Sequence, residues 1–286
     1  MIGSRFVETF KDRNILLVPD LNVFDMTRID SVAAYFKDHP DIGAVINFAA
    51  YTNVSEAQKQ RGDKNSLCYQ VNVIGTQNLV EQTKGTEIYL IHISTDMVFP
   101  GDASDPGPYA EDHAICIDQN RLTWYGYTKA LAEKIVTDGI SSSAILRTIC
   151  PVVKKYDFKA DYLRVPLVYY EKNQDLYPIF SDQRVNITDV NEICHVLNIL
   201  LDRRLSGIFH AACRDLTTPY EVMTTLFQTV YGTHDMVKPG LVVEFLKKNN
   251  DPTRYPQFGG LSVKATEEKL GVKFSTYKEI IQRLYE

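Results

Sequence analysis

The sequence IHISTDMVF at residues 91–99 is followed, after a polar loop, by YGYTK at residues 125–129. The first stretch is an apolar run that ends in hydroxyl side chains, and the second contains Tyr125 and Lys129 four residues apart. Positions i and i+4 lie on the same face of a helix, so both side chains are expected to project into one site. The two stretches predict a strand and a helix that meet at this site.

These residue types suit the protonation of a carbonyl oxygen. An ammonium group at Lys129 would lower the pKa of Tyr125 from about 10 toward neutrality, so that the phenol could act as a general acid. Thr95, at the carboxyl end of its strand, could donate a hydrogen bond to the same oxygen. Because Tyr-x-x-x-Lys also occurs on ordinary amphipathic helices, this hypothesis depends on the rest of the sequence.

Composition excludes several classes of function. The 286 residues are 44% hydrophobic and 23% charged, which is typical of a soluble globular protein. The net charge of -5 and the pI near 5.7 argue against a general nucleic-acid binder. The sequence contains no apolar run of membrane-spanning length and no signal peptide pattern. Five cysteines without a C-x-x-C pair favour reduced thiols in a cytoplasmic protein without a metal site.

Short apolar runs alternate with helical patterns along the first half of the chain. This alternation predicts an α/β fold with a doubly wound parallel sheet. Residues 1–150 and about 185–206 are expected to form a dinucleotide-binding domain, and about 151–184 and 207–286 a smaller substrate-binding lobe. The expected strands are 15–18, 44–49, 89–93, 144–147 and 207–212, and the expected helices are 30–37, 66–84, 125–137, 162–170 and 187–201.

The N-terminus departs from the usual order of this fold. Ile2, Phe6 and Phe10 form one face of a helix, although such sheets normally begin with a strand. The sequence MIGSR at residues 1–5 looks like the last third of a glycine-rich phosphate loop, with Gly3 as its final glycine. We therefore expect the first strand and most of this loop to be missing from the sequence, and the gene product or an ancestor to begin upstream. Alternatively, Gly3 is only a small residue near a helix start.

Many motifs in order resemble the extended short-chain dehydrogenases/reductases, and most of all the dTDP-4-dehydrorhamnose reductases, over nearly the whole chain. That family reduces a 4-keto sugar nucleotide with NADPH or NADH. The matching stretches are MIGS (1–4), FDMT (24–27), VINFAAYTNV (45–54), VNVIGT (71–76), STDMVF (94–99), YGYTK (125–129), LRT (146–148), SDQ (181–183), GIFH (207–210) and RYP (254–256).

The resemblance implies a role for particular residues. Thr95, Tyr125 and Lys129 match the catalytic hydroxyl, acid and lysine, and Asn72 matches an asparagine that supports the lysine through a water relay. Asp25 could instead cap the turn that follows it, and Ala49 and Ala50 could be small for packing. The residues implied to bind NADPH or NADH are Ile2, Gly3, Asp25, Met26, Ala50, Tyr51, Thr52, Tyr125 and Lys129.

The resemblance also implies a sugar-nucleotide substrate, bound by Thr95, Asp96 and Tyr125. A cation near the diphosphate is needed because a buried unpaired dianion is very unfavourable, and Arg254 is expected to supply it, with Arg184 in reserve. Met97 and Cys150 stand where the rhamnose-forming enzymes have aromatic residues, so the nucleotide and the sugar stay open. The resemblance is also compatible with a homodimer.

Three functions follow from these observations. The first is NAD(P)H-dependent reduction of a 4-keto-6-deoxy sugar nucleotide in surface-polysaccharide synthesis. The second is an epimerase or dehydratase of the same superfamily, against which Met97 counts, because the dehydratases place an Asp-Glu pair after the catalytic threonine. The third is a binding or regulatory subunit like that of methionine adenosyltransferase, to which the sequence DQRV at 182–185 has some likeness.

Overall fold

A four-stranded parallel sheet forms the centre of the protein. The computed structural model describes residues 1–156, 158–249 and 255–286. The strands of the sheet are β1 (Ala44–Asn47), β2 (Tyr89–Thr95), β3 (Ser143–Thr148) and β7 (Gly207–Ala211), in the spatial order β1-β2-β3-β7. The predicted doubly wound α/β fold is confirmed.

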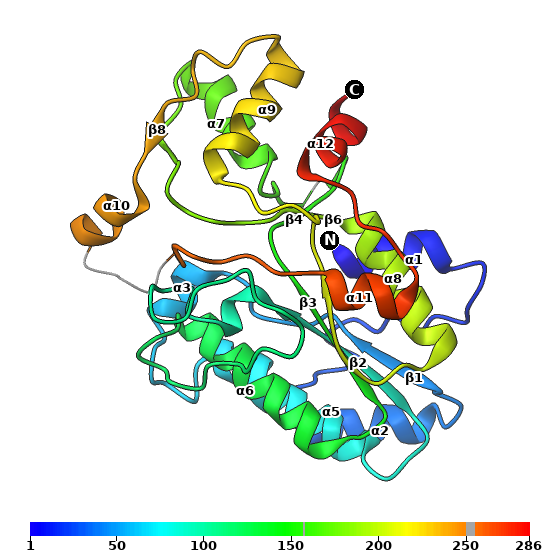
Figure 1. Ribbon diagram of the computed structural model, residues 1–286. Helices are drawn as coiled ribbons and strands as arrows, with labels where there is room; N and C mark the ends of the chain where they lie inside the picture. Colours follow the sequence, from blue (N-terminus) through cyan, green and yellow to red (C-terminus); the bar gives the residue numbers. More distant parts are fainter. Residues whose placement is uncertain (157, 250–254) are drawn as a thin grey trace.

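Helices cover both faces of the sheet (Figure 1). On one face lie α1 (Ile2–Phe10) and α8 (Val190–Arg203), and on the other lie α2 (Ile29–Asp38), α5 (Gly75–Thr83) and α6 (Trp124–Gly139). Every residue of β3 is buried, and so are six of the seven residues of β2. A strand covered on both faces needs a continuous apolar run, which explains why the sequence of β2 does not alternate.

The carboxyl end of β2 meets the amino end of α6. The Thr123 hydroxyl caps this helix by accepting a hydrogen bond from the Gly126 N–H at 3.0 Å. A Cβ atom at Gly126 would lie 2.2 Å from the carbonyl oxygen of Met97. Only glycine therefore lets α6 approach the short 3-10 turn η2 (Asp96–Val98) that follows β2.

The helix predicted over residues 66–84 is confirmed but interrupted. It begins as α4 (Leu67–Tyr69), continues as a π-helical turn η1 (Gln70–Ile74), and ends as α5. Asn72 lies in the middle of the π turn and is buried. Single π turns within α-helices occur often at functional sites.

The strand predicted over residues 15–18 is wrong. The segment is not hydrogen-bonded into any strand of the described chain, and Ile15 and Val18 are 97% and 66% exposed. An apolar run becomes a strand only where a neighbouring strand pairs with its backbone. Within the described residues, β1 pairs only with β2, and Ala44 to Ile46 are not fully buried.

A smaller lobe follows the sheet. It contains α7 (Arg164–Asn173), α9 (Pro219–Tyr231), α10 (Val242–Asn249), α12 (Tyr277–Tyr285) and the strand pair β5 (Ile179–Phe180) and β8 (Pro239–Gly240). A second pair, β4 (Pro151–Val152) and β6 (Thr188–Asp189), lies at its base (Figure 1). The lobe has its own apolar cluster.

The predicted boundary at residue 207 is wrong. Strand β7 pairs with β3 in the main sheet, and Phe209 of β7 packs with Leu270 of α11 (Lys264–Leu270) in the core of the larger domain. Although β7 follows the first segment of the smaller lobe in the sequence, most of its apolar residues are buried in the main sheet, so it belongs to the larger domain. The chain therefore returns to the larger domain twice after entering the smaller lobe.

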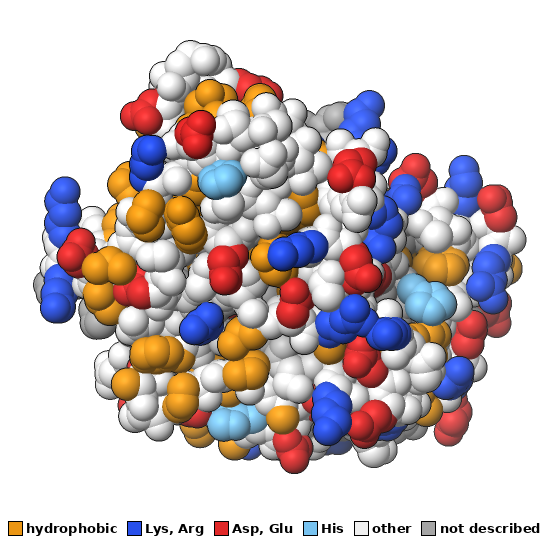
Figure 2. Space-filling view, turned by 45° about the horizontal axis from the view of Figure 1, so that its top comes forward, with side chains coloured by type: hydrophobic (Ala, Val, Ile, Leu, Met, Phe, Trp, Pro, Cys, Tyr) orange, Lys and Arg blue, Asp and Glu red, His pale blue; other side chains and the backbone are white. Residues whose placement is uncertain are grey.

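Surface charge is mixed. On the face shown in Figure 2, Lys and Arg side chains are interspersed with Asp and Glu side chains. No helix in the described ranges has both the length and the apolar character that crossing a bilayer requires.

A buried ion pair joins α6 to β3. Arg147 and Glu133 are 1% and 2% exposed, and the Arg147 Nη2 lies 2.8 Å from the Glu133 Oε2. Ser94 of β2 donates a hydrogen bond to the same carboxylate, and the Arg147 guanidinium stacks over Phe99. Removing one member of a buried pair leaves the other charge without compensation.

We expect Glu133→Gln to lower the free energy of unfolding by about 3–5 kcal/mol, because Arg147 would stay charged and buried. Urea denaturation followed by circular dichroism measures this loss. The matched control is Lys134→Ala on the same helix, whose exposed pair with Asp138 is worth at most about 1 kcal/mol. Equal effects of the two substitutions would contradict the proposed importance of the buried pair.

Candidate active site

The predicted catalytic residues lie together at the carboxyl end of β2. Thr95 is the last residue of the strand, and its hydroxyl accepts a hydrogen bond from the Met97 N–H at 3.3 Å and donates one to the Asp96 carboxylate at 3.0 Å. Tyr125 is the second residue of α6, and its phenol contacts the Thr95 hydroxyl. The two hydroxyl groups therefore face one site, as the sequence predicts.

Tyr125 has a higher pKa than the sequence predicts. Burial raises the pKa of its phenol above the ordinary value of 10, and the nearby Asp96 carboxylate raises it further. The hydrogen bond with Thr95 acts in the opposite direction. The expectation that Lys129 lowers this pKa toward neutrality is wrong for the ligand-free protein, because the Lys129 amino group is engaged elsewhere.

Lys129 is 2% exposed and points toward β2. Its Nζ donates a hydrogen bond to the Ile93 carbonyl oxygen at 2.7 Å and lies 2.9 Å from the Nε2 of His92. Burial lowers the pKa of Lys129 to about 8, while the Glu133 carboxylate one turn further along α6 acts against this shift. The amino group is therefore close to its titration midpoint in mildly alkaline solution.

Asn72 fastens the loop that follows β1. Its side-chain oxygen accepts a hydrogen bond from the Tyr51 N–H at 2.8 Å, and its Nδ2 donates to the Thr128 hydroxyl at 3.0 Å. These bonds hold the loop against α6, one residue before Lys129. The water-mediated support of Lys129 by Asn72 stays a prediction.

The residues predicted to bind the cofactor approach the same end of the sheet from β1 and α1. Gly3 lies against the ring of Phe48, which an added Cβ would meet at 3.1 Å. Within the described residues, no side chain caps the amino end of α1, so its first N–H groups are available to an anion. Ala50, Tyr51 and Thr52 follow β1, and Ile2, the first residue of α1, is half-buried against the main apolar core.

Asp25 and Met26 have structural partners of their own. The Asp25 carboxylate accepts hydrogen bonds from the Thr27 N–H at 2.9 Å and from the Thr27 hydroxyl at 2.7 Å, so it caps the turn that follows it. Met26 is 6% exposed and fills the space beside Gly75. The adenine-binding role of both residues stays a prediction.

The predicted substrate residues come from different parts of the chain. Asp96 lies in the site, where burial raises the pKa of its carboxyl to about 7 against hydrogen bonds that lower it. Arg184 lies on the smaller lobe with an exposed side chain, and its N–H donates to the Gln257 carbonyl oxygen at 2.8 Å. Arg254 lies outside the described residues.

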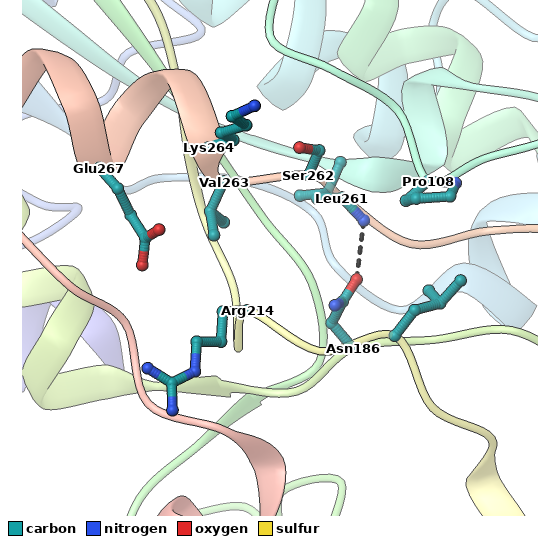
Figure 3. Close-up of a pocket in the computed structure, with 9 residues that line it drawn as sticks. Pro108, Asn186, Arg214, Leu261, Ser262, Val263, Lys264 and Glu267 are labelled. Atoms are coloured by element: carbon teal, nitrogen blue, oxygen red, sulfur yellow. Dashed lines mark hydrogen bonds between the residues drawn. The ribbon is translucent and has the colours of Figure 1, made fainter.

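A surface hollow beside α11 is lined by a different set of residues. Figure 3 shows Arg214 and Glu267 on opposite sides of it, with Lys264 on α11 and the Leu261 N–H donating to the Asn186 side chain at 2.7 Å. None of the residues predicted for catalysis or binding lines this hollow. We assign it no part in the active site.

Sequence reasoning missed two residues of the site. Asn47 ends β1, and His92 lies in the middle of β2, where it contacts Lys129. Both are buried and polar. The sequence pattern that could have identified them is a polar residue within an otherwise apolar strand. A buried polar group needs hydrogen-bond partners, so such a residue indicates a polar contact in the core.

We expect Asp96→Asn to change how stability depends on pH. A carboxyl whose pKa is about 7 when folded and 3.8 when unfolded stabilises the fold below pH 3.8, and this contribution is lost as the pH rises through 7. The asparagine variant should therefore gain stability relative to the unmodified protein between pH 4.5 and pH 8. Urea midpoints at both values measure the difference.

The control for this prediction is Asp112→Asn, which removes an exposed carboxylate. It should leave the pH dependence of the urea midpoint unchanged. Parallel profiles for the Asp96 variant and the unmodified protein would show that the Asp96 carboxyl does not titrate near neutrality.

Comparisons with known proteins agree with this geometry. The protein is 27% identical to a dTDP-4-dehydrorhamnose reductase from Sinorhizobium fredii, over 91% of this chain and 85% of that protein. It is 28% identical to methionine adenosyltransferase 2 subunit beta from Xenopus tropicalis, over 71% of this chain and 58% of that protein. A crystal structure of dTDP-4-dehydrorhamnose reductase from Bacillus anthracis in complex with NADP has the same fold, with a TM-score of 0.84 at 22% identity, covering 99% of this chain and 94% of that one.

A family model provides the broadest match. The model described as RmlD substrate binding domain matches residues 1–286, which is the whole chain. This match includes the strand that ends in Thr95, the helix that carries Tyr125 and Lys129, and the smaller lobe. The protein therefore belongs to the RmlD substrate binding domain family, in agreement with the resemblance of its motifs.

Proposed function

We propose that this protein reduces the 4-keto group of a 4-keto-6-deoxy sugar nucleotide with NADPH or NADH, in the synthesis of a surface polysaccharide. The observation that carries the proposal is the placement of Thr95 and Tyr125 at the carboxyl end of β2, with Lys129 one helical turn further along α6, against His92 and the Ile93 carbonyl oxygen. Membership of the RmlD family and the likeness to a dTDP-4-dehydrorhamnose reductase support the same reaction.

Each of the three residues has a distinct task. The Tyr125 phenol donates its proton to the carbonyl oxygen of the substrate, and the Thr95 hydroxyl donates a hydrogen bond to the same oxygen. The high pKa of Tyr125 in the ligand-free protein keeps its proton in place until a substrate arrives. Because the oxygen gains negative charge during reduction, both donors stabilise the transition state more than the ground state.

The nicotinamide cofactor, when bound, supplies the hydride that reduces the carbonyl carbon. The residues present fit such a group. The amino end of α1 offers uncapped N–H groups for a pyrophosphate, and the small residues Ala49 and Ala50 leave room at the end of β1. Lys129 would hold the nicotinamide ribose, and Asp25 with Met26 would border the adenosine.

Asp96 and the smaller lobe would define the substrate. Asp96 lies beside Tyr125, where its carboxyl can bind a sugar hydroxyl. Arg184, on the lobe, would pair with the diphosphate, as would Arg254. Met97 and Cys150 leave more room than the aromatic residues of the rhamnose-forming enzymes, which favours a sugar or nucleotide different from theirs. We place the reaction in the cytoplasm.

A second candidate function has one specific observation in its favour. The likeness to methionine adenosyltransferase 2 subunit beta supports a role as the binding subunit of another enzyme. Such a protein would bind a synthetase and would turn over no sugar nucleotide. Turnover assays with a 4-keto sugar nucleotide distinguish the two functions.

Cofactor binding is testable through Trp124, the only tryptophan. It is 1% exposed and packs in the same apolar cluster as Tyr125 and Tyr51. We expect NADPH or NADH to quench its emission saturably, because a reduced nicotinamide bound beside Tyr125 absorbs at the wavelength that indole emits. The signal should disappear in Lys129→Ala and persist in the control Lys134→Ala. A folded protein without quenching would contradict the proposed cofactor site.

Catalysis is testable through Tyr125. We expect Tyr125→Phe to lower kcat by about 10²–10⁴-fold, because the general acid is lost, while Trp124 quenching by the cofactor is retained. The control is Tyr127→Phe, two residues along α6, whose ring stacks on Trp124. Its kcat should stay close to that of the unmodified protein. Full activity of Tyr125→Phe would remove this residue from the mechanism.

A further inference from the structure

Three buried polar side chains form a line from β1 to α6. Asn47, His92 and Lys129 are 5%, 1% and 2% exposed. Asn47 and His92 are direct neighbours across the strands, with the Asn47 Nδ2 3.2 Å from the His92 Nδ1. On the other side of the imidazole, the His92 Nε2 lies 2.9 Å from the Lys129 Nζ.

In this line, the hydrogen-bonding role of each side chain determines the role of the next one. The Asn47 side-chain oxygen accepts a hydrogen bond from the Ala49 N–H at 3.1 Å, so the Asn47 amide presents its NH₂ group to His92. The His92 Nδ1 must then accept, and the single proton of a neutral imidazole is at Nε2. This proton points at the Lys129 Nζ, which can accept it only as an uncharged amine.

A charged Lys129 needs a different arrangement. An ammonium group has three donors and no acceptor, so the His92 Nε2 would have to be free of its proton. The proton would then be at Nδ1 and would need the Asn47 oxygen as acceptor. The Asn47 amide would have to turn, and its NH₂ group would face the Ala49 N–H, breaking the hydrogen bond that holds the turn after β1.

We propose that Asn47 and His92 are positioning residues that couple the charge of Lys129 to the turn after β1, through the tautomer of His92 and the orientation of the Asn47 amide. The coupling deepens the proposed function, because Lys129 and this turn are the groups expected to bind the nicotinamide cofactor. The heavy-atom positions in the structure, with the Asn47 side-chain oxygen on the Ala49 N–H, match the uncharged arrangement. The charged arrangement differs by one proton on Lys129 and a shift of the His92 proton from Nε2 to Nδ1.

The groups around this line allow such an exchange. Burial and the charge of Lys129 hold the pKa of His92 well below its usual range, so that an imidazolium takes no part. The pKa of Lys129 is lowered to about 8, which makes both of its charge states accessible near neutrality. The charged or titratable groups facing it are His92 from β2 and Glu133 on its own helix.

Glu133 acts on Lys129 through its charge, and this carboxylate is itself paired with Arg147 of β3. Asp96 of η2 and Cys68 of α4 act on the phenol of Tyr125. The proton exchange itself therefore uses only the three residues of the line.

The coupling has a consequence for cofactor binding. If the bound cofactor favours charged Lys129, binding above the titration point of this residue takes up one proton from solvent. Affinity for the cofactor should then fall up to tenfold for each unit of pH above that point. By linkage, the cofactor would shift His92 toward its Nδ1–H tautomer by the same free energy.

The decisive experiment is ¹⁵N NMR of the full chain labelled at histidine, without cofactor, from pH 6 to pH 10. The two ring nitrogens report the tautomer directly. We expect His92 to change from the Nδ1–H form at low pH to the Nε2–H form at high pH. His92→Gln assigns its signals, and the exposed His195 and His234 serve as references in the same spectra. A single tautomer of His92 across the range would overturn the proposal.

Asn47→Asp tests the role of the amide. A carboxylate accepts both from the Ala49 N–H and from the His92 Nδ1–H, so this variant should keep the Nδ1–H tautomer at every pH. A pH-dependent change of tautomer in this variant like that of the unmodified protein would contradict the assignment to Asn47. If the variant does not fold, the titration of the unmodified protein still decides the proposal.

Adding NADPH at pH 9 separates this inference from the proposed function. A shift of His92 toward Nδ1–H supports both. A tautomer change with pH that NADPH does not affect supports the coupling and counts against the cofactor site. Binding of NADPH seen by Trp124 quenching, without any tautomer change, supports the cofactor site and rejects the coupling.

Discussion

The contact between one stripe of α6 and the polar side of β2 determines the rest of the structure. Tyr125, Lys129 and Glu133 are four residues apart and face the sheet together. Tyr125 meets Thr95, Lys129 meets His92 and the Ile93 carbonyl oxygen, and Glu133 meets Ser94 and Arg147. The residues proposed for catalysis, at one end of the stripe, and a buried ion pair, at the other, thus share one helix face.

The buried charges of Glu133 and Arg147 hold α6 in a fixed position against the sheet. Glu133 and Arg147 are fully buried and satisfy each other, so any tilt of α6 would separate two charges in the core. Gly126 allows α6 to pack closely against the residues after β2, because any side chain at this position would collide with the Met97 carbonyl oxygen. The position of Tyr125 relative to Thr95 follows from these two constraints. A site held by a helix and a strand is more exact than one built on loops.

The sequence predicted the parts of the structure that depend on local geometry. The i, i+4 spacing placed Tyr125 and Lys129 on one face because every α-helix has this period. The buried strands β2 and β3 are largely apolar at their centres, which makes them easy to identify. The run at residues 15–18 was equally apolar but has no strand to pair with, and pairing is a property of distant chain segments.

The parts that the sequence did not predict are contacts between distant residues. His92 is 37 residues from Lys129 and 45 residues from Asn47 in the sequence. Helix and strand periodicity relates only residues that are close in sequence, so it does not predict these contacts. The same limit explains the misplaced boundary at residue 207, where β7 returns to the sheet. The pKa of Tyr125 was predicted in the wrong direction because burial and Asp96 act on it, while the Lys129 amino group is directed at β2.

Cys150 lies where the two lobes meet. It follows β3 with a φ of 40°, a left-handed conformation that is strained for a residue with a side chain. Its side chain packs against the apolar clusters of both lobes, and its carbonyl oxygen accepts a hydrogen bond from the Thr188 N–H of β6 at 3.3 Å. The chain therefore bends at this residue to leave the sheet, and the thiol is directed to the junction of the lobes. A bulky aromatic side chain at this bend would need more room at the junction of the two lobes than the cysteine does.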